Sequence, residues 1–166
     1  KLLPNIPGLS LGSFYNTSEG VCGDYYDVLP SRVDRISFIL ADVAGKGMTS
    51  LVIMVMIRAI MRLIVNTTQS ASTILSWVNR GIALESNIDH FASLALINYD
   101  STAKKIQYAT AGSTPILYYN SKTDEITQIS KVTEPIGVEK NTTYTDNELE
   151  VNSGDIIIMY SDGVAE

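Results

Sequence analysis

The sequence has few of the residues that soft metal sites and covalent catalysis require. It contains one cysteine, Cys22, and one histidine, His90, among 166 residues. A single cysteine cannot form an internal disulfide, which fits a reducing compartment. Together the two residues cannot supply the three or four nitrogen and sulfur ligands of usual zinc centres. No Gly-x-Ser-x-Gly segment with a partnered base is evident, so the sequence also argues against a serine triad.

Long apolar runs and basic clusters are missing as well. The longest apolar run, Leu51–Ile57, ends at Arg58 and is much shorter than the roughly 20 residues of a membrane span. Acidic side chains outnumber basic ones by 18 to 12, and no block of lysine or arginine matches the charge of a nucleic-acid backbone. We therefore expect a cytoplasmic domain without nucleic acid or direct membrane contact, in a parent protein that could itself be membrane-anchored.

Length and composition fit one domain with one substantial core. Of the 166 residues, 45% are hydrophobic, and the chain contains no repeat, long linker or low-complexity tract. The chain opens on Lys1 and stops at Glu166 within a glycine-containing turn signal. We expect a single domain over residues 1–166, excised from a longer protein and shortened at its C-terminal end. The sequence does not indicate the oligomeric state.

Apolar periodicity predicts an antiparallel series of strands with two inserted helices. The predicted strands are residues 24–29, 36–42, 91–99, 106–111, 116–119, 126–129 and 155–160. The first helix is predicted from a cap at Thr49 or Ser50 to Val65, and the second from near Ser70 or Ser72. The last strand, an unbroken apolar run, is expected to be buried. This order predicts an α+β fold in which the helices cover sheet faces.

Three aspartates follow one pattern at the ends of these strands. A hairpin centred at Val33 places Asp24 opposite Asp42, where like charges about 5 Å apart are destabilising. Asp162 also follows an apolar strand and precedes Gly163. Any one of these acids alone is more often a turn residue. The three together favour a hard divalent cation such as magnesium or manganese, which binds carboxylate, carbonyl and water oxygens.

Six ordered segments extend this interpretation to a family. They are GDYYD (23–27), DVAGKG (42–47), FASL (91–94), AGSTP (111–115), PIGV (135–138) and GDIIIMYSDGVAE (154–166). In order and spacing they resemble the bacterial PP2C-like serine/threonine phosphatases of the stage II sporulation protein E and sigma-factor regulator type. The resemblance implies a four-layer α-β-β-α sandwich of two antiparallel sheets, with two manganese or magnesium ions at one end.

The same resemblance assigns roles to individual residues. Asp24 would bridge both metals, Asp42 and the backbone carbonyl of Val43 would bind one of them, and Asp162 would bind the other. A metal-activated water would attack the phosphorus of a phosphoserine or phosphothreonine in line. The expected partner is a phosphorylated regulatory protein, typically an anti-sigma-factor antagonist, in bacterial signal transduction.

Two departures from the family pattern leave alternatives open. The family usually has Ala-Gly-His-Asn-Pro where this chain has Ala111-Gly112-Ser113-Thr114-Pro115, so no general acid is assigned. The family also has a further metal-binding aspartate in a segment beyond Asp162, and the sequence stops at Glu166 before it. One alternative is therefore a catalytically impaired relative that binds a regulatory partner. Another is a structural sandwich in which the acids only form turns.

Overall fold

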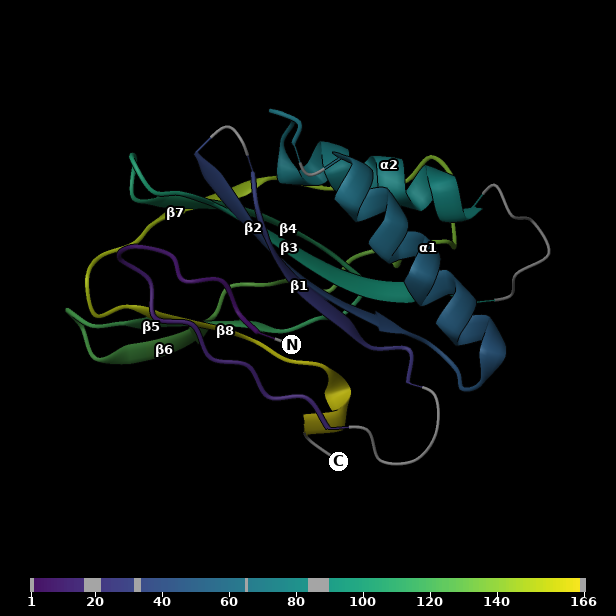
Figure 1. Cartoon of the computed structure of the whole chain (residues 1–166), viewed down its shortest axis with the longest axis horizontal. Coiled ribbons are helices and arrows are strands. Elements are labelled where there is room, and N and C mark those ends of the chain that lie inside the picture. The colour runs from purple at the N-terminus through teal and green to yellow at the C-terminus, as the bar shows by residue number, and fades with distance from the viewer. Residues whose placement is uncertain (1, 17–21, 32–33, 65, 84–89, 165–166) are drawn as a thin grey trace.

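The computed structural model describes residues 2–16, 22–31, 34–64, 66–83 and 90–164, which form two antiparallel β-sheets and two α-helices (Figure 1). The five-stranded sheet has the order β1 (Tyr25–Pro30), β2 (Arg35–Val43), β3 (Ala92–Asp100), β4 (Lys105–Ala111) and β7 (Asn147–Glu150). The three-stranded sheet has the order β6 (Glu125–Gln128), β5 (Ile116–Asn120) and β8 (Ile156–Met159). The prediction of an α+β fold with two antiparallel sheets is confirmed.

The hairpin of β1 and β2 has the predicted register. Tyr26 pairs with Leu40 and Val28 pairs with Phe38. The expected centre of the turn, Val33, lies outside the described residues. Buried and less buried residues alternate along both strands, so the apolar pattern fixes which side chains face the helices. The register brings the start of β1 and the end of β2 to the same end of the sheet.

Helix α1 (Met48–Ile64) begins slightly earlier than predicted. Ser50 was one of the two expected caps, but it lies inside the first turn, fully buried, and its hydroxyl donates to the carbonyl of Gly47 at 2.9 Å. The reason is the backbone of Gly47, whose φ of +91° lets the chain turn directly into the helix. Val65, the expected last residue, lies outside the described residues.

Helix α2 (Ala71–Ala83) begins where the sequence predicted. The Ser70 hydroxyl accepts a long hydrogen bond of 3.4 Å from the backbone N–H of Thr73, as an N-cap does.

Among the described residues, no helix is long and apolar enough to cross a membrane.

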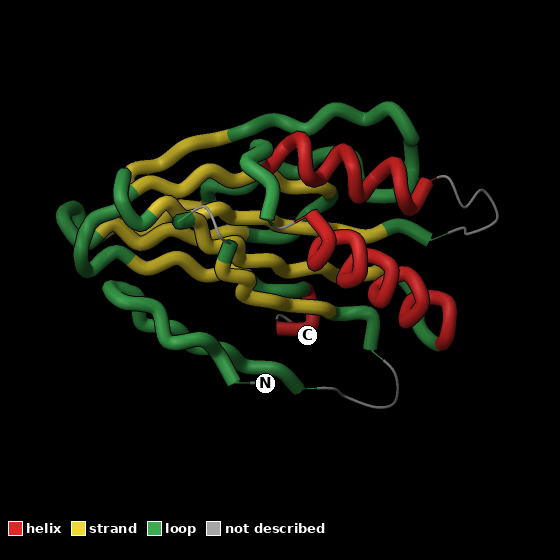
Figure 2. Tube along the Cα trace, turned by 45° about the horizontal axis from the view of Figure 1, so that its top comes forward, coloured by secondary structure: helices red, strands yellow, loops and turns green. Residues whose placement is uncertain are grey.

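Both helices lie on one face of the five-stranded sheet, as Figure 2 shows. Their buried residues form one core with that face, while the opposite face packs against the three-stranded sheet in a second core. The outer face of the three-stranded sheet is covered by no helix among the described residues. Ile126, Ile156 and Ile158 on this sheet are 69%, 52% and 50% exposed. The described chain therefore forms a helical layer and two sheet layers.

Two strands differ from their predictions. The sequence did not predict β7, because its residues, Asn-Glu-Leu-Glu, show no apolar alternation and are largely exposed. The strand forms through backbone pairing with β4 at the sheet edge, where charged residues are common. The prediction that β8 is buried was wrong on one face, since alternate residues of its apolar run are exposed.

Candidate metal centre

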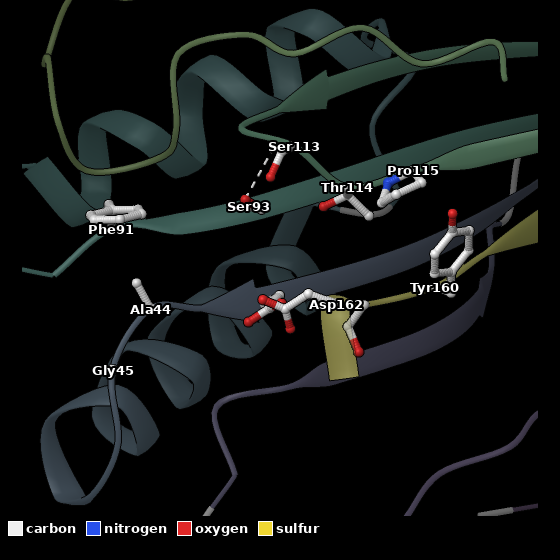
Figure 3. Close-up of a pocket in the computed structure, with 11 residues that line it drawn as sticks. Ala44, Gly45, Phe91, Ser93, Ser113, Thr114, Pro115, Tyr160 and Asp162 are labelled. Carbon is white, nitrogen blue, oxygen red and sulfur yellow. Dashed lines mark hydrogen bonds between the residues drawn. The ribbon is translucent and has the colours of Figure 1, made fainter. Parts of the chain in front are cut away.

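Three carboxylates from both sheets meet at one end of the molecule. Asp42 lies near the end of β2, Asp24 directly precedes β1, and Asp162 begins a short 3₁₀ turn (Asp162–Val164) that follows β8. Asp42 and Asp162 line the same pocket, shown in Figure 3. The hydroxyl of Ser161 donates to the Asp24 carboxylate at 2.8 Å, joining two segments 137 residues apart. The folded chain thus brings together the aspartates that the sequence singled out.

The negative charges in this group oppose one another. Burial raises the pKa of the Asp42 carboxyl to about 7, and the neighbouring charges of Asp24 and Asp162 add to the rise. A side-chain hydrogen bond with Asp162 contributes in the same direction. Without a positive partner, full ionisation of all three groups at neutral pH is therefore unfavourable. A bound cation would remove this conflict.

The oxygen donors at this end suit a hard divalent cation. In the described part of the chain, no three His, Cys, Asp or Glu side chains are placed to hold one ion together. A cation held here would complete its coordination with other oxygens, such as a backbone carbonyl or water. Magnesium is commonly bound in this way, through one or two carboxylates with several retained waters.

Gly23 packs closely against the backbone of Val43. A Cβ atom at Gly23 would lie 2.9 Å from the Val43 carbonyl oxygen and 3.1 Å from the Val43 Cβ. A side chain at position 23 would therefore collide with the carbonyl group that the family resemblance assigns to a cation. Cys22, the residue before Gly23, contacts the backbone of Asp24. Its Sγ accepts a weak hydrogen bond of 3.4 Å from the backbone N–H of Asp24.

The pocket beside the carboxylates has a volume of about 400 Å³ and contains no basic side chain among its described lining residues. Its lining consists of Asp42, Ala44, Gly45, Phe91, Ser93, Ser113, Thr114, Pro115, Tyr160, Ser161 and Asp162. Figure 3 shows Asp162 on one side of the pocket and Ser113 and Thr114, from the turn between β4 and β5, on another, with the rings of Phe91 and Tyr160 far apart from each other. Sequence reasoning missed the hydroxyl groups of Ser93 and Ser161, because serine occurs in many turns and nothing local marks these two.

Two other side chains near this end, His90 and Lys46, could in principle bind or protonate a ligand. Neither is among the described residues that line the pocket. Lys46 is exposed to solvent. The ring of His90 packs against Gly45, so that a Cβ there would lie 3.1 Å from Nε2.

The fold is shared with several solved structures. One is the PP2C phosphatase domain of SpoIIE from Bacillus subtilis, with a TM-score of 0.74 and 20% identity over 87% of this chain and 43% of that one. Another is RsbX in complex with magnesium, with a TM-score of 0.73 and 15% identity over 88% of this chain and 69% of that one. At these identities the likeness establishes the fold.

Curated relatives include two phosphoserine phosphatases of Bacillus subtilis (strain 168). RsbU is 28% identical over 99% of this chain and 49% of its own length, and RsbP is 23% identical over 95% of this chain and 40% of its own length. The chain thus spans about half the length of RsbU. Residues 32–166 match the stage II sporulation protein E (SpoIIE) family, so the chain belongs to that family.

Proposed function

We propose that this chain is a metal-dependent protein serine/threonine phosphatase that hydrolyses phosphoserine or phosphothreonine on a regulatory protein. The observation that supports this most directly is the meeting of Asp24, Asp42 and Asp162 at the edge of a pocket without a basic lining residue. The same convergence favours an enzyme over a partner-binding module that lacks catalysis.

The charge of the pocket is the reason to include cations in the proposal. A phosphate monoester is strongly anionic near neutral pH, and carboxylates alone would repel it. Two magnesium or manganese ions would reverse the local charge, lower the pKa of a water molecule and neutralise the phosphoryl oxygens. The oxygen donors of the site match both ions, while the single cysteine and single histidine of the chain argue against zinc.

The residues of the chain divide the work of holding these cations. Asp24, Asp42 and Asp162 would provide carboxylate oxygens, and Val43 would provide its backbone carbonyl. The Ser161 hydroxyl restrains the orientation of the Asp24 carboxylate by donating to one of its oxygens. We assign no general acid, because His90 does not line the pocket, so solvent would protonate the leaving alcohol.

The substrate class follows from the relatives as well as from the site. RsbU and RsbP are named phosphoserine phosphatases, which supports a seryl phosphate as the group that is hydrolysed. Phe91 and Tyr160 also line the pocket, which would have to admit a phosphorylated side chain from a protein surface. An anti-sigma-factor antagonist is the proposed physiological substrate, and the cytoplasm is the proposed location.

Hydrolysis of p-nitrophenyl phosphate and of a phosphoserine peptide with manganese tests the proposal. Asp24→Asn should lose at least about 100-fold in kcat/KM, because a carboxylate that holds the cations is removed. Asp34→Asn is the matched control, since it makes the same change at the opposite end of the hairpin, on an exposed residue. Equal rates for wild type and Asp24→Asn would rule out the proposed mechanism.

A further inference from the structure

The hydroxyl of Thr114 is buried in the wall of the pocket without a partner. Thr114 is 4% exposed, and among the described residues its Oγ1 has no hydrogen-bond partner. A buried hydroxyl without a partner costs free energy, so such groups in native proteins need an explanation. Because Thr114 lines the pocket, a ligand bound there is a natural partner for this oxygen.

The turn that presents Thr114 is held rigidly from both sides. Gly112 has a φ of +74°, and a Cβ at this position would lie 2.9 Å from the Cα of Ser93, so only glycine fits. The backbone N–H of Ser113 donates to the Ser93 hydroxyl at 3.2 Å, the dashed line in Figure 3. On the other side, the N–H of Thr133 donates to the Gly112 carbonyl at 2.9 Å. The backbone of this turn is thus held in place before a ligand binds.

Pro115 makes this hydroxyl more important as a donor. Proline has no backbone N–H and restricts the residue before it to extended conformations. The chain therefore offers no main-chain donor at the position after Thr114. Across the pocket lies Asp162, whose ionised carboxylate can only accept hydrogen bonds (Figure 3). The two walls are chemically complementary, with acceptors on one and hydroxyl donors on the other.

We propose that the Thr114 hydroxyl donates a hydrogen bond to a phosphoryl oxygen of the substrate, on the side of the phosphate away from the carboxylates. Thr114 is then a substrate-binding residue, and its hydroxyl would stabilise the negative charge that develops on the phosphoryl oxygens during reaction. The inference rests on the proposed phosphatase function and adds to it the residue that recognises the phosphoryl group.

The test compares Thr114→Val, which removes the hydroxyl while nearly preserving shape, with Thr114→Ser, which keeps it. In manganese-loaded protein, Thr114→Val should raise the dissociation constant of inorganic phosphate, measured by calorimetry, by about 10-fold to 100-fold. The value of kcat/KM for a phosphoserine peptide should fall by a similar factor. Thr114→Ser should stay within about threefold of wild type in both measurements. The melting temperature of Thr114→Val should not fall, since no hydrogen bond within the protein is lost.

Thr110→Val provides the matched control. Thr110 is also a buried threonine of this region, but its hydroxyl already donates to the carbonyl of Lys131 at 3.1 Å. This variant should have a lower melting temperature and unchanged phosphate affinity, the reverse of Thr114→Val. If Thr114→Val binds phosphate as wild type does, or if Thr114→Ser is impaired equally, the inference is wrong while the phosphatase proposal stands. A wild-type protein that neither binds phosphate nor hydrolyses the peptide would instead overturn the phosphatase proposal.

Discussion

Burial and two neighbouring carboxylates oppose a negative charge on Asp42. Its pKa of about 7 lies above the value near 3.9 of an unfolded chain, so the folded protein binds the proton more tightly. In metal-free protein, the stability linked to this group is fully present below about pH 4 and is lost as the pH rises through about 7. Deprotonation of Asp42 therefore destabilises the metal-free fold.

The corresponding prediction concerns Asp42→Asn in chelator-treated protein. At pH 8 its free energy of unfolding should exceed that of wild type by roughly 1–2 kcal/mol, after allowance for solvent screening of a partly exposed group. The difference should shrink as the pH falls and vanish near pH 4. Urea unfolding at a series of pH values measures it. A variant that is less stable than wild type at pH 8 would contradict the electrostatic interpretation.

At the scale of single residues, the sequence predicted the acids of the site and missed the hydroxyls. Asp24, Asp42 and Asp162 could be recognised because each lies at the start or end of an apolar strand. Ser161 and Thr114 could not, because their importance depends on what lies opposite them. Ser161 contacts Asp24 across 137 residues of sequence, and Thr114 is notable only because it has no partner.

An ion pair between the buried Asp27 and the largely exposed Arg62 connects helix α1 to strand β1. Asp27 is 2% exposed, receives a hydrogen bond from the Arg62 guanidinium at 2.6 Å, and receives another from the Tyr25 hydroxyl at 2.8 Å. Burial and the bond to Asp27 raise the pKa of Tyr25, so its hydroxyl stays protonated and continues to donate. The pair fixes how the C-terminal half of α1 lies on the sheet.

Removal of the Arg62 guanidinium from this ion pair should destabilise the protein. Arg62→Ala leaves a buried carboxylate with fewer donors, and we expect a loss of about 2–3 kcal/mol in the free energy of unfolding. Arg58→Ala, one turn earlier on an exposed part of the same helix, should change it by no more than about 0.5 kcal/mol. Urea denaturation compares the two. Equal losses would contradict a specific contribution from the ion pair, because alanine is itself the best helix former and neither change weakens the helix through propensity.

Elements with an apolar period could be predicted, and those formed by pairing alone could not. The β1–β2 register and both helices follow from side chains that alternate or recur at helical spacing. Strand β7 exists because β4 has an unpaired edge, a property of the folded sheet that no local pattern shows. The start of α1 was displaced because the backbone of Gly47, and not a side-chain cap, sets it.

For the whole molecule, the important feature is that the carboxylates come from different sheets. Asp24 and Asp42 belong to the five-stranded sheet, and Asp162 follows β8 of the three-stranded sheet. Sequence patterns predicted the strands but did not divide them between two sheets, because the faces in contact are both apolar. The two-sheet arrangement was expected from the family resemblance, and the structure has it.

Cation binding should therefore stabilise the whole fold. Manganese at 100 times its dissociation constant is expected to add about 2.7 kcal/mol to the free energy of unfolding and so raise the melting temperature. Asp162→Asn should lose most of this rise, whereas Asp34→Asn should retain it. Thermal unfolding followed by circular dichroism, with and without manganese, measures the effect. The same rise in both variants would place the binding site elsewhere.

The origin of the carboxylates in two sheets has a consequence for regulation. A cation bound by groups on both sheets has an affinity that depends on how the sheets are aligned, so a partner that slides one over the other changes that affinity. Thermodynamic reciprocity then requires the cation to alter the partner's binding by the same factor.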